Sequence, residues 1–329
     1  MTTETTSRTP PAPRDPRTSG TGRAAAGSAA PRPTRWQRLR RSESAAFYLF
    51  LAPWLVGLVG LTLGPMLFSL YAGFTRWDGV NSPEWIGLDN FRVMFGSDPD
   101  FWPSFGRTFL YAGARVVLGV ALALALAVAL NTRLPGRTFF RTVFFLPAIV
   151  TGVPMFVVWA WMFDPDLGIL NYLLSTVGIE GPAWLGDTTW ALPALVLMSL
   201  TATGGTMIIF LAGLQGVPME LREAALVDGA GWWHRFRAVT VPIISPVILF
   251  NVLMGLIASL QVFAEPFVMT SGGPERSTYV FGMYLYNEAF WYSNVGYASA
   301  LAWVQFLVIV ALTFLVLRFA RRRVHYLGS

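Results

Sequence analysis

The sequence contains no cysteine, and all 24 of its basic residues are arginine, so lysine is absent as well. Without these residues the chain cannot carry thiol chemistry, a lysine Schiff base or the phosphate-binding lysine of a P-loop. Charge is also scarce, because charged residues make up 13% of the 329 residues and hydrophobic residues 54%. We therefore expect no catalytic residue, no metal site and no cofactor bound by this chain. If ATP drives the protein, a separate chain must bind ATP and Mg.

The hydrophobic residues form long blocks, which is typical of a membrane protein with several spans. A bilayer core of roughly 30 Å needs about 20 helical residues. Six runs meet this length, at about 46–74, 108–130, 142–163, 190–214, 243–269 and 297–318. Prolines lie in or at the ends of several runs, which a bundle tolerates because neighbouring helices satisfy the freed carbonyls. We predict an all-α integral membrane protein with six transmembrane helices over residues 44–329.

Residues 1–43 are rich in Thr, Pro, Ser, Gly, Ala and Arg, with Trp36 as the only aromatic residue. This composition cannot bury enough apolar surface to fold, so we expect a disordered cytoplasmic tail. The first apolar run starts near Ala45, too far from the start for a cleavable signal peptide, and we expect it to remain as an anchor.

The distribution of arginine predicts the orientation in the membrane. Most arginines lie in the tail, in the 131–141 and 215–242 loops and at the C-terminus, whereas four lie in the alternate loops, as Arg76, Arg92, Arg107 and Arg276. Both termini are therefore predicted to be cytoplasmic. The two long outer loops, about 75–107 and 270–296, are rich in aromatic residues, Gly and Asn. They suit either interfacial anchoring with turns or docking of an extracytoplasmic partner.

The stretch EAALVDGAGWWHRFRAVTVP, residues 223–242, carries five ionisable side chains between two uncharged apolar runs. Pro218 suits the first turn of a short helix, Glu223 lies near the positive end of that helix, and Gly229 suits its left-handed end. A second segment is predicted from Trp232 to Val239, ending before Pro242. This helix, turn and helix fits either docking into a groove of a partner or an ordinary amphipathic interfacial loop.

These residues resemble the EAA loop of ABC importer permeases, whose pattern is E-A-A-x3-G-x9-I-x-L-P. Every spacing is matched, with valine at the isoleucine and leucine positions, by Glu223, Ala224, Ala225, Gly229, Val239, Val241 and Pro242. In that family the loop is the coupling helix that inserts into the ATP-binding subunit. The resemblance therefore implies a type I ABC importer permease fold. It also implies that the loop, about 216–242, couples to an ATPase through Glu223, Ala224, Ala225, Asp228, Gly229, Val239 and Pro242.

The resemblance covers about residues 44–320 and is strongest to the carbohydrate-uptake branch, of the maltose, glycerol-phosphate, lactose and multiple-sugar type. It implies four kinds of partner: a second related permease, an ATP-binding cassette ATPase dimer, an extracytoplasmic solute-binding protein and a carbohydrate substrate. An ABC permease for a peptide, amino acid or ion is the alternative. An ATP-independent carrier is a more distant alternative, because it would leave the EAA pattern without purpose. An intramembrane enzyme is also distant, because the two histidines, His234 and His325, are far apart in predicted cytoplasmic segments.

Polar residues inside membrane spans are candidates for a substrate path. They are Arg115, Thr151, Thr201, Thr203, Thr206, Asn251, Ser259, Gln261, Glu265 and Gln305. Glu265 suits an interhelical or interfacial partner as well as a substrate contact, Arg115 suits snorkelling or pairing, and isolated Ser and Thr usually bond to their own helix. Alignment to a maltose-type permease implies sugar-lining positions at Ala148, Gly152, Met198, Thr201, Ala202, Gly255, Ser259 and Val262. The last three are expected to share one face of the fifth span.

Overall fold

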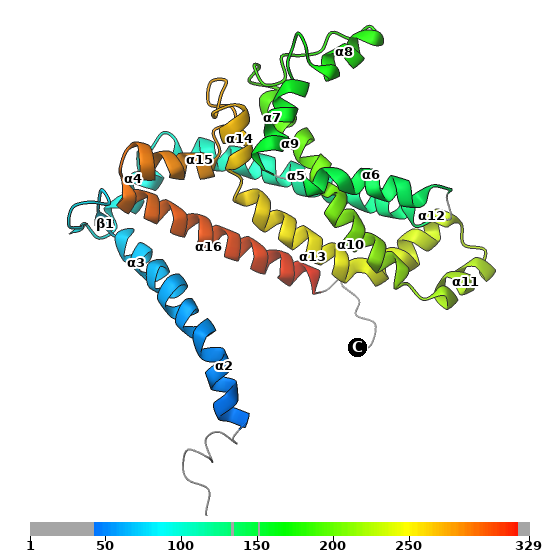
Figure 1. Ribbon diagram of the computed structural model, residues 1–329, viewed down its shortest axis with the longest axis horizontal. Coiled ribbons are helices and arrows are strands. Elements are labelled where there is room, and N and C mark those ends of the chain that lie inside the picture. The colour runs from blue at the N-terminus through cyan, green and yellow to red at the C-terminus, as the bar shows by residue number, and fades with distance from the viewer. Residues whose placement is uncertain (1–42, 133–134, 151, 322–329) are drawn as a thin grey trace, which may run out of the picture. The chain divides into compact units, whose positions relative to one another are not determined.

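The computed structural model describes residues 43–132, 135–150 and 152–321 (Figure 1). These residues are mostly helical, which confirms the predicted all-α class; one antiparallel pair of two-residue strands is also present. The chain divides into two compact units, Met1–Thr62 and Leu63–Ser329. The predicted tail, 1–43, lies outside the described residues except for Glu43.

The first unit consists, in its described part, of α2 (Glu43–Gly57) and most of the π-helical segment η1 (Leu58–Leu63). Pro53 lies inside α2. Large apolar side chains such as Phe50 and Leu61 are exposed, at 85% and 83%. A helix that is apolar on all sides is expected where lipid or protein surrounds it.

The second unit holds the remaining elements. They are α3 (Gly64–Ala72), β1 (Thr75–Arg76), β2 (Glu84–Trp85), α4 (Asp89–Gly96), α5 (Phe101–Leu130), α6 (Arg137–Ile149), α7 (Val153–Met162), α8 (Ile169–Thr176), α9 (Ala191–Leu200), η2 (Thr201–Thr203), α10 (Gly204–Gln215), α11 (Met219–Val227), α12 (Trp232–Arg235), η3 (Phe236–Thr240), α13 (Val241–Leu260), α14 (Ala264–Met269), α15 (Phe281–Tyr286), η4 (Asn287–Trp291) and α16 (Val295–Ala320). The segment η2 is a 3-10 helix, whereas η3 and η4 are π-helical.

In the part of the chain that the structure describes, five helical stretches are long and apolar enough to cross a membrane: Phe47–Ala72, Phe101–Leu130, Ala191–Gln215, Trp232–Leu260 and Val295–Ala320. A sixth arises if α6 and α7 count as one span, although they are bent by 108°. The predicted span 142–163 is therefore not one straight helix. Pro147 lies inside α6, and Gly152 before α7 has φ +81°, where the right-handed helix cannot continue.

Two other predicted span limits are wrong. The second span begins at Phe101 instead of 108, and the fifth covers Trp232–Leu260 instead of 243–269. After Leu260 the backbone leaves the helix and α14 starts at Ala264. Pro266 explains this break, because a proline has no N–H to donate and its ring would clash with a helical carbonyl four residues earlier.

The helix α5 packs against α9, α10 and α13, and α13 packs against α16 (Figure 1). Small residues allow this close approach: Ala123 and Ala127 of α5 are fully buried in a cluster with Phe210 and Ile244. Close contact of α10 with α6 depends on Gly204, because a Cβ there would lie 2.3 Å from the carbonyl oxygen of Phe144. These contacts hold the helices in a bundle.

At the other end of α5, short helices close the bundle. Phe101 and Tyr111 of α5 pack with Phe281 and Tyr284 of α15 in one buried cluster. The backbone N–H of Phe281 donates to the hydroxyl of Thr108 at 2.8 Å, which ties α15 to α5. This cluster supports the two long predicted outer loops, about 75–107 and 270–296.

Candidate functional site

The loop between α10 and α13 forms the predicted helix and glycine turn. Pro218 was predicted in the first turn of this helix. In the structure it is the N-cap of α11, one position before that turn. At the other end Gly229 has φ +76°, its N–H donates to the carbonyl of Leu226, and the N–H of Ala230 donates to that of Ala225. This pair of bonds is a Schellman motif, which ends a helix with a left-handed residue. The turn predicted at Gly229 is confirmed.

The second helix of this loop differs from the prediction. Instead of ending before Pro242, α12, η3 and α13 form one continuous helix from Trp232 to Leu260. Pro242 lies in the first turn of α13, and the preceding turn, Phe236–Thr240, is a wide π-helical turn. A π-helical turn leaves room for a proline ring, so the helix passes Pro242 without a break. Val239 and Pro242, both half-buried, thus belong to the base of the span.

The surface of α11 is largely unpartnered within this chain. Glu223, Ala224 and Asp228 are exposed, whereas Ala225 is half-buried. Leu226 and Val227 are exposed at 56% and 88%. The short helix and its C-cap thus present the carboxylates of Glu220, Glu223 and Asp228 beside small and apolar side chains, a combination that suits contact with another protein.

A cavity of about 320 Å³ lies among α5, α9, η2, α10 and α13. Three of the predicted substrate-path residues, Ala202, Gly255 and Ser259, line this cavity. It is also lined by other polar residues that the sequence singled out, namely Arg115, Thr203, Thr206 and Asn251. Ser259 is buried, and its hydroxyl has no hydrogen-bond partner in the described part of the chain. A buried hydroxyl without a partner is free to bond to a polar solute.

Other predicted path residues do not line this cavity. Ala148 and Gly152 lie on either side of the bend between α6 and α7, Met198 is buried against Phe156 and Phe163, and Val262 is buried in the cluster with Phe281. Gln261 and Val262 follow the end of α13, so the expectation that Val262 shares a helical face with Gly255 and Ser259 is wrong. Thr201 does not line the cavity either, and its hydroxyl donates to the carbonyl of Met198, as isolated threonines usually do. Thr203, which does line the cavity, donates in the same way to the carbonyl of Leu200.

Glu265, the acidic residue expected near the end of the fifth span, forms an ion pair. Its carboxylate lies 3.5 Å from the guanidinium of Arg115, and the two side chains are 15% and 26% exposed. Arg115 also donates to the hydroxyl of Tyr111 at 3.3 Å. Pairing, one of the two interpretations of Arg115, is therefore what the structure shows.

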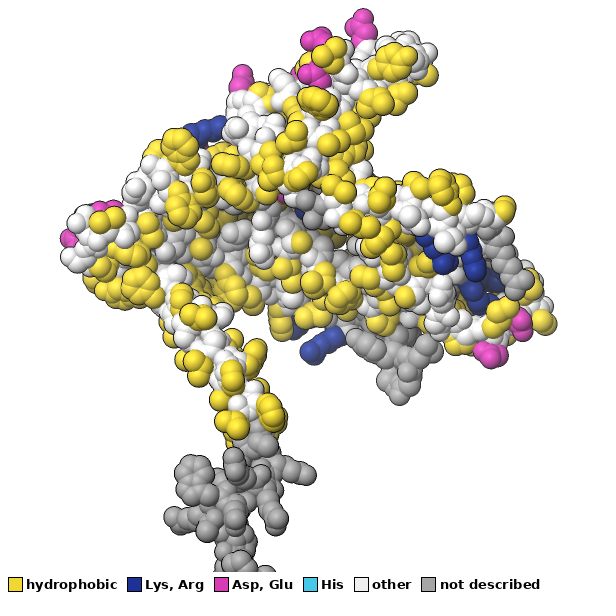
Figure 2. Space-filling model, in the orientation of Figure 1, with side chains coloured by type: hydrophobic (Ala, Val, Ile, Leu, Met, Phe, Trp, Pro, Cys, Tyr) yellow, Lys and Arg dark blue, Asp and Glu magenta, His cyan; other side chains and the backbone are white. Residues whose placement is uncertain are grey.

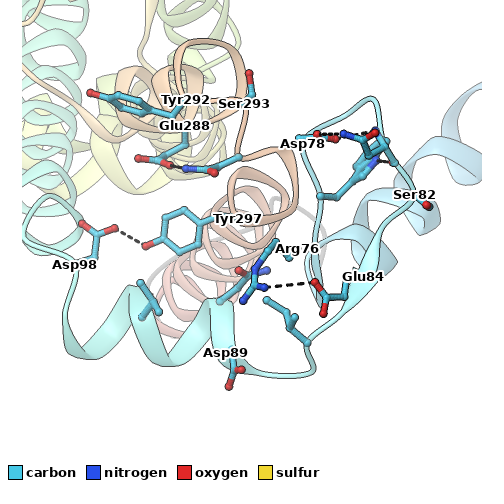
Figure 3. A pocket seen from close by; sticks show the side chains of 16 residues that line it. Arg76, Asp78, Ser82, Glu84, Asp89, Asp98, Glu288, Tyr292, Ser293 and Tyr297 are labelled. Carbon is cyan, nitrogen blue, oxygen red and sulfur yellow. Dashed lines mark hydrogen bonds and ion pairs between the residues drawn. The ribbon is translucent and has the colours of Figure 1, made fainter.

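A second cavity, of about 770 Å³, lies where the two long predicted outer loops meet (Figure 3). One wall comes from β1, β2 and α4, and the other from η4 and the start of α16. Asp98 joins them: it accepts a hydrogen bond from Tyr297 at 2.5 Å and another from Tyr284. Figure 3 shows Tyr297 pointing at Asp98. No sequence motif marks these three residues, since they are brought together from positions almost 200 apart.

Two half-buried carboxylates of this cavity, Asp98 and Glu288, have pKa values shifted in opposite directions. Burial alone would raise the pKa of Asp98, but hydrogen bonds from Tyr284 and Tyr297, together with those from the backbone N–H groups of Asp100 and Phe101, outweigh it and hold the pKa below its usual value. For Glu288 burial prevails and raises the pKa, although Asn294 donates to its carboxylate at 2.9 Å. Nowhere in the described residues do three or more His, Cys, Asp or Glu side chains come together in a way that could hold a metal ion.

Comparison with known proteins identifies the family. Residues 115–325 match the model of the binding-protein-dependent transport system inner membrane component. The chain is 39% identical to the probable ABC transporter permease protein YesP of Bacillus subtilis, over 87% of this chain and 94% of that one. It is 34% identical to the lactose transport system permease protein LacF of Rhizobium radiobacter, over 87% of this chain and 97% of the relative.

A third relative is the sulfoquinovosyl glycerol transport system permease protein SmoG of Agrobacterium fabrum, with 33% identity over 89% of this chain and 95% of the relative. Among solved structures, the fold resembles a chain of a bacterial ABC transporter involved in alginate import, with a TM-score of 0.76 and 22% identity. That match covers 87% of this chain and 98% of the other, and it shows the type I ABC importer permease fold. The chain belongs to the binding-protein-dependent transport system inner membrane component family, as a permease that crosses the membrane several times.

Proposed function

We propose that the chain is the permease subunit of an ATP-driven importer that receives a sugar from a solute-binding protein and moves it inward. The names of its relatives support a sugar, since LacF belongs to a lactose system and SmoG to a sulfoquinovosyl glycerol system. The cavity at Ser259 and Gly255 supports passage of a polar solute, because it is lined by hydroxyl, amide and guanidinium groups between small residues. A peptide, amino acid or ion as the solute has no comparable support.

In this importer, other chains supply the energy for transport. ATP and Mg are bound by an ATPase dimer, while a second related permease completes the membrane path and an extracytoplasmic protein delivers the solute. The absence of lysine and of a P-loop supports this division. Concentration of arginine in alternate loops supports cytoplasmic termini and a cytoplasmic α11.

The observation that carries the proposal is α11 with its Gly229 turn. Its exposed surface has the size and charge of a docking element, with Glu223 supplying the docking charge and Ala224 and Ala225 allowing close approach. Asp228 and Gly229 end the helix, so α11 keeps a defined angle to the span that begins at Trp232. Val239 and Pro242, at the base of that span, transmit the movement of α11 to the bundle.

The mechanism follows as a switch between two states. ATP draws the two ATPase subunits together and so moves the coupling helices, while the loaded binding protein favours the outward-open bundle. Each ligand shifts the equilibrium only because it binds one state better than the other. No covalent chemistry is assigned to this chain.

The test replaces Glu223 by lysine and, separately, Gly229 by valine, in a complex expressed with the ATPase, second permease and binding protein of the same organism. Glu220→Lys changes a charge on the same helix, and Gly231→Val adds the same side chain where φ is −61°. We expect the first two variants to lose co-purification with the ATPase or ATP-dependent uptake of sugar, and the controls to retain both. Normal assembly and uptake by Glu223→Lys and Gly229→Val would refute the coupling role.

A further inference from the structure

A hollow of about 490 Å³ lies beneath α11, on the side facing the bundle. It is bounded by the ends of α5 and α10, by α11 and by the first turns of the helix that begins at Trp232. Figure 2 shows basic side chains gathered in a hollow at the end of the second unit that carries α11 and α12. Two of its lining residues are Arg222 and Arg235, and we call this hollow the Arg222–Arg235 pocket.

Both arginines lack an acidic partner. Within the described ranges neither Arg222 nor Arg235 forms an ion pair, although Glu223 also lines the pocket. The Nε atom of Arg235 is buried and has no hydrogen-bond partner there. A guanidinium stays charged at any physiological pH, so a buried donor of this kind is costly until an acceptor reaches it. With one carboxylate and two guanidiniums, the lining has a net positive charge that one anionic group would neutralise.

The other wall of the pocket is apolar. Leu214, Met219 and Leu226 line it, and the rings of Trp232 and Phe236 are stacked 5.7 Å apart with an interplanar angle of 4°. A small inorganic anion would satisfy the arginines but leave this wall uncovered. A ligand that combines an anionic group with an aliphatic chain fits both walls.

The position of the pocket indicates which class of ligand fits it. Three membrane spans end at it: Phe101–Leu130, Ala191–Gln215 and Trp232–Leu260. Span ends lie at the depth of the lipid headgroups, where tryptophan is also enriched. Trp232 and Trp233, each 60% exposed, lie at this level.

We propose that the Arg222–Arg235 pocket binds an anionic phospholipid. The phosphate accepts hydrogen bonds from the guanidiniums of Arg222 and Arg235, and one acyl chain covers Leu214, Met219 and Leu226. Because the lipid fills the space between α11 and the spans, it supports α11 from behind and leaves Ala224, which is exposed and does not line the pocket, accessible on the outer side.

The test measures lipid binding to the purified full-length chain in detergent by native mass spectrometry, during titration with dioleoyl phosphatidylglycerol. The double variant Arg222→Gln, Arg235→Gln removes both charges. Arg237→Gln is the matched control, because Arg237 is an exposed arginine two positions away that does not line the pocket. Met219→Glu keeps both arginines but places a carboxylate on the apolar wall; Met219 is 64% exposed, so this variant is expected to fold. Circular dichroism checks the fold of each variant.

We expect the double variant and Met219→Glu each to weaken phosphatidylglycerol binding about tenfold or more, which is the size of a lost charge-assisted bond. Arg237→Gln is expected to bind normally, and dioleoyl phosphatidylcholine to bind at least about tenfold more weakly than phosphatidylglycerol. Equal loss in Arg237→Gln would show general surface charge and overturn the site. Equal binding of phosphatidylcholine would overturn the anionic headgroup, and displacement of the lipid by millimolar inorganic phosphate would identify a free anion as the ligand instead.

Discussion

The guanidinium of Arg115 in α5 lies 3.5 Å from the carboxylate of Glu265 in α14, a residue 150 positions further along the chain. The pair lies beside the cavity that contains Ser259, because Arg115 also lines that cavity. The pair therefore holds α14, the short helix that follows the end of α13, against α5. A charge in this position needs its partner, since both side chains are mostly buried.

Removing one member of the Arg115–Glu265 pair should destabilise the protein more than removing both. Glu265→Gln leaves Arg115 without its partner, and we expect a loss of about 1–2 kcal/mol in unfolding free energy, less than a fully buried pair because both side chains keep some exposure. Adding Arg115→Met should restore part of this loss. Thermal unfolding of the four proteins of this double-mutant cycle in detergent measures the coupling, and strictly additive effects would contradict it.

Any residue with a Cβ at position 229 should lower the stability of the turn. Its φ of +76° is costly for other residues, whereas an added Cβ would meet no atom within 4 Å, so the cost comes from the backbone alone. We expect Gly229→Ala to cost about 1 kcal/mol. Gly231, where φ is −61° and a Cβ is also unobstructed, is the control and should accept alanine without loss. Hydrogen exchange of the amides in α11 measures the difference in stability between the two variants. Equal protection in both variants would contradict the predicted backbone strain at Gly229.

Gly255 should set the width of the cavity that contains Ser259. A Cβ at this position would lie 3.6 Å from Val116, so a leucine would extend into a cavity of about 320 Å³. We expect Gly255→Leu to reduce solute uptake at least about tenfold in the complete transporter while ATPase assembly is retained. Gly113→Leu places the same side chain on an exposed face of α5 with no atom within 4 Å, and it should transport normally. Normal uptake by Gly255→Leu would place the solute path elsewhere.

Acid should weaken the link between Asp98 and the two tyrosines. The pKa of Asp98 in the folded protein is below the ordinary 3.8, so its carboxylate stabilises the fold above that pH. This contribution is lost as the pH falls from about 3.8 through the folded value. Hydrogen exchange of residues 281–297 should therefore rise in that range.

Two variants separate this link from general acid effects. Asp98→Asn should remove the pH dependence below about 3.8, because the side chain no longer ionises. Asp89→Asn serves as the control, since Asp89 is exposed and pairs with Arg92 on its own helix. If Asp98→Asn and Asp89→Asn keep the same pH profile as the unchanged protein, Asp98 does not hold these segments together.

Local physics explains why several predictions from the sequence are confirmed. A block of about 20 apolar residues needs a helix to satisfy its backbone in a membrane, and a glycine after a short helix suits a left-handed end. Neither statement depends on distant residues, so the spans and the turn at Gly229 were predictable. The limits of the fifth span were harder to predict. Trp232 is apolar enough for a span yet follows directly on a charged loop, and Pro242 suggested a break in the helix, which the π-helical turn avoids.

The amino-acid sequence by itself determined the helical class, the approximate positions of the spans, the shape of the α11 loop and, through the EAA spacing, the resemblance to ABC importer permeases. Tertiary structure decided which polar residues meet. It brought Arg115 to Glu265, Asp98 to Tyr297 and Arg222 and Arg235 into one pocket, and it kept Ala148 and Met198 out of the cavity that contains Ser259. The reason is that a helix records its own apolar and polar positions in a periodic pattern, whereas the rotation and depth at which two helices pack depend on all their side chains together.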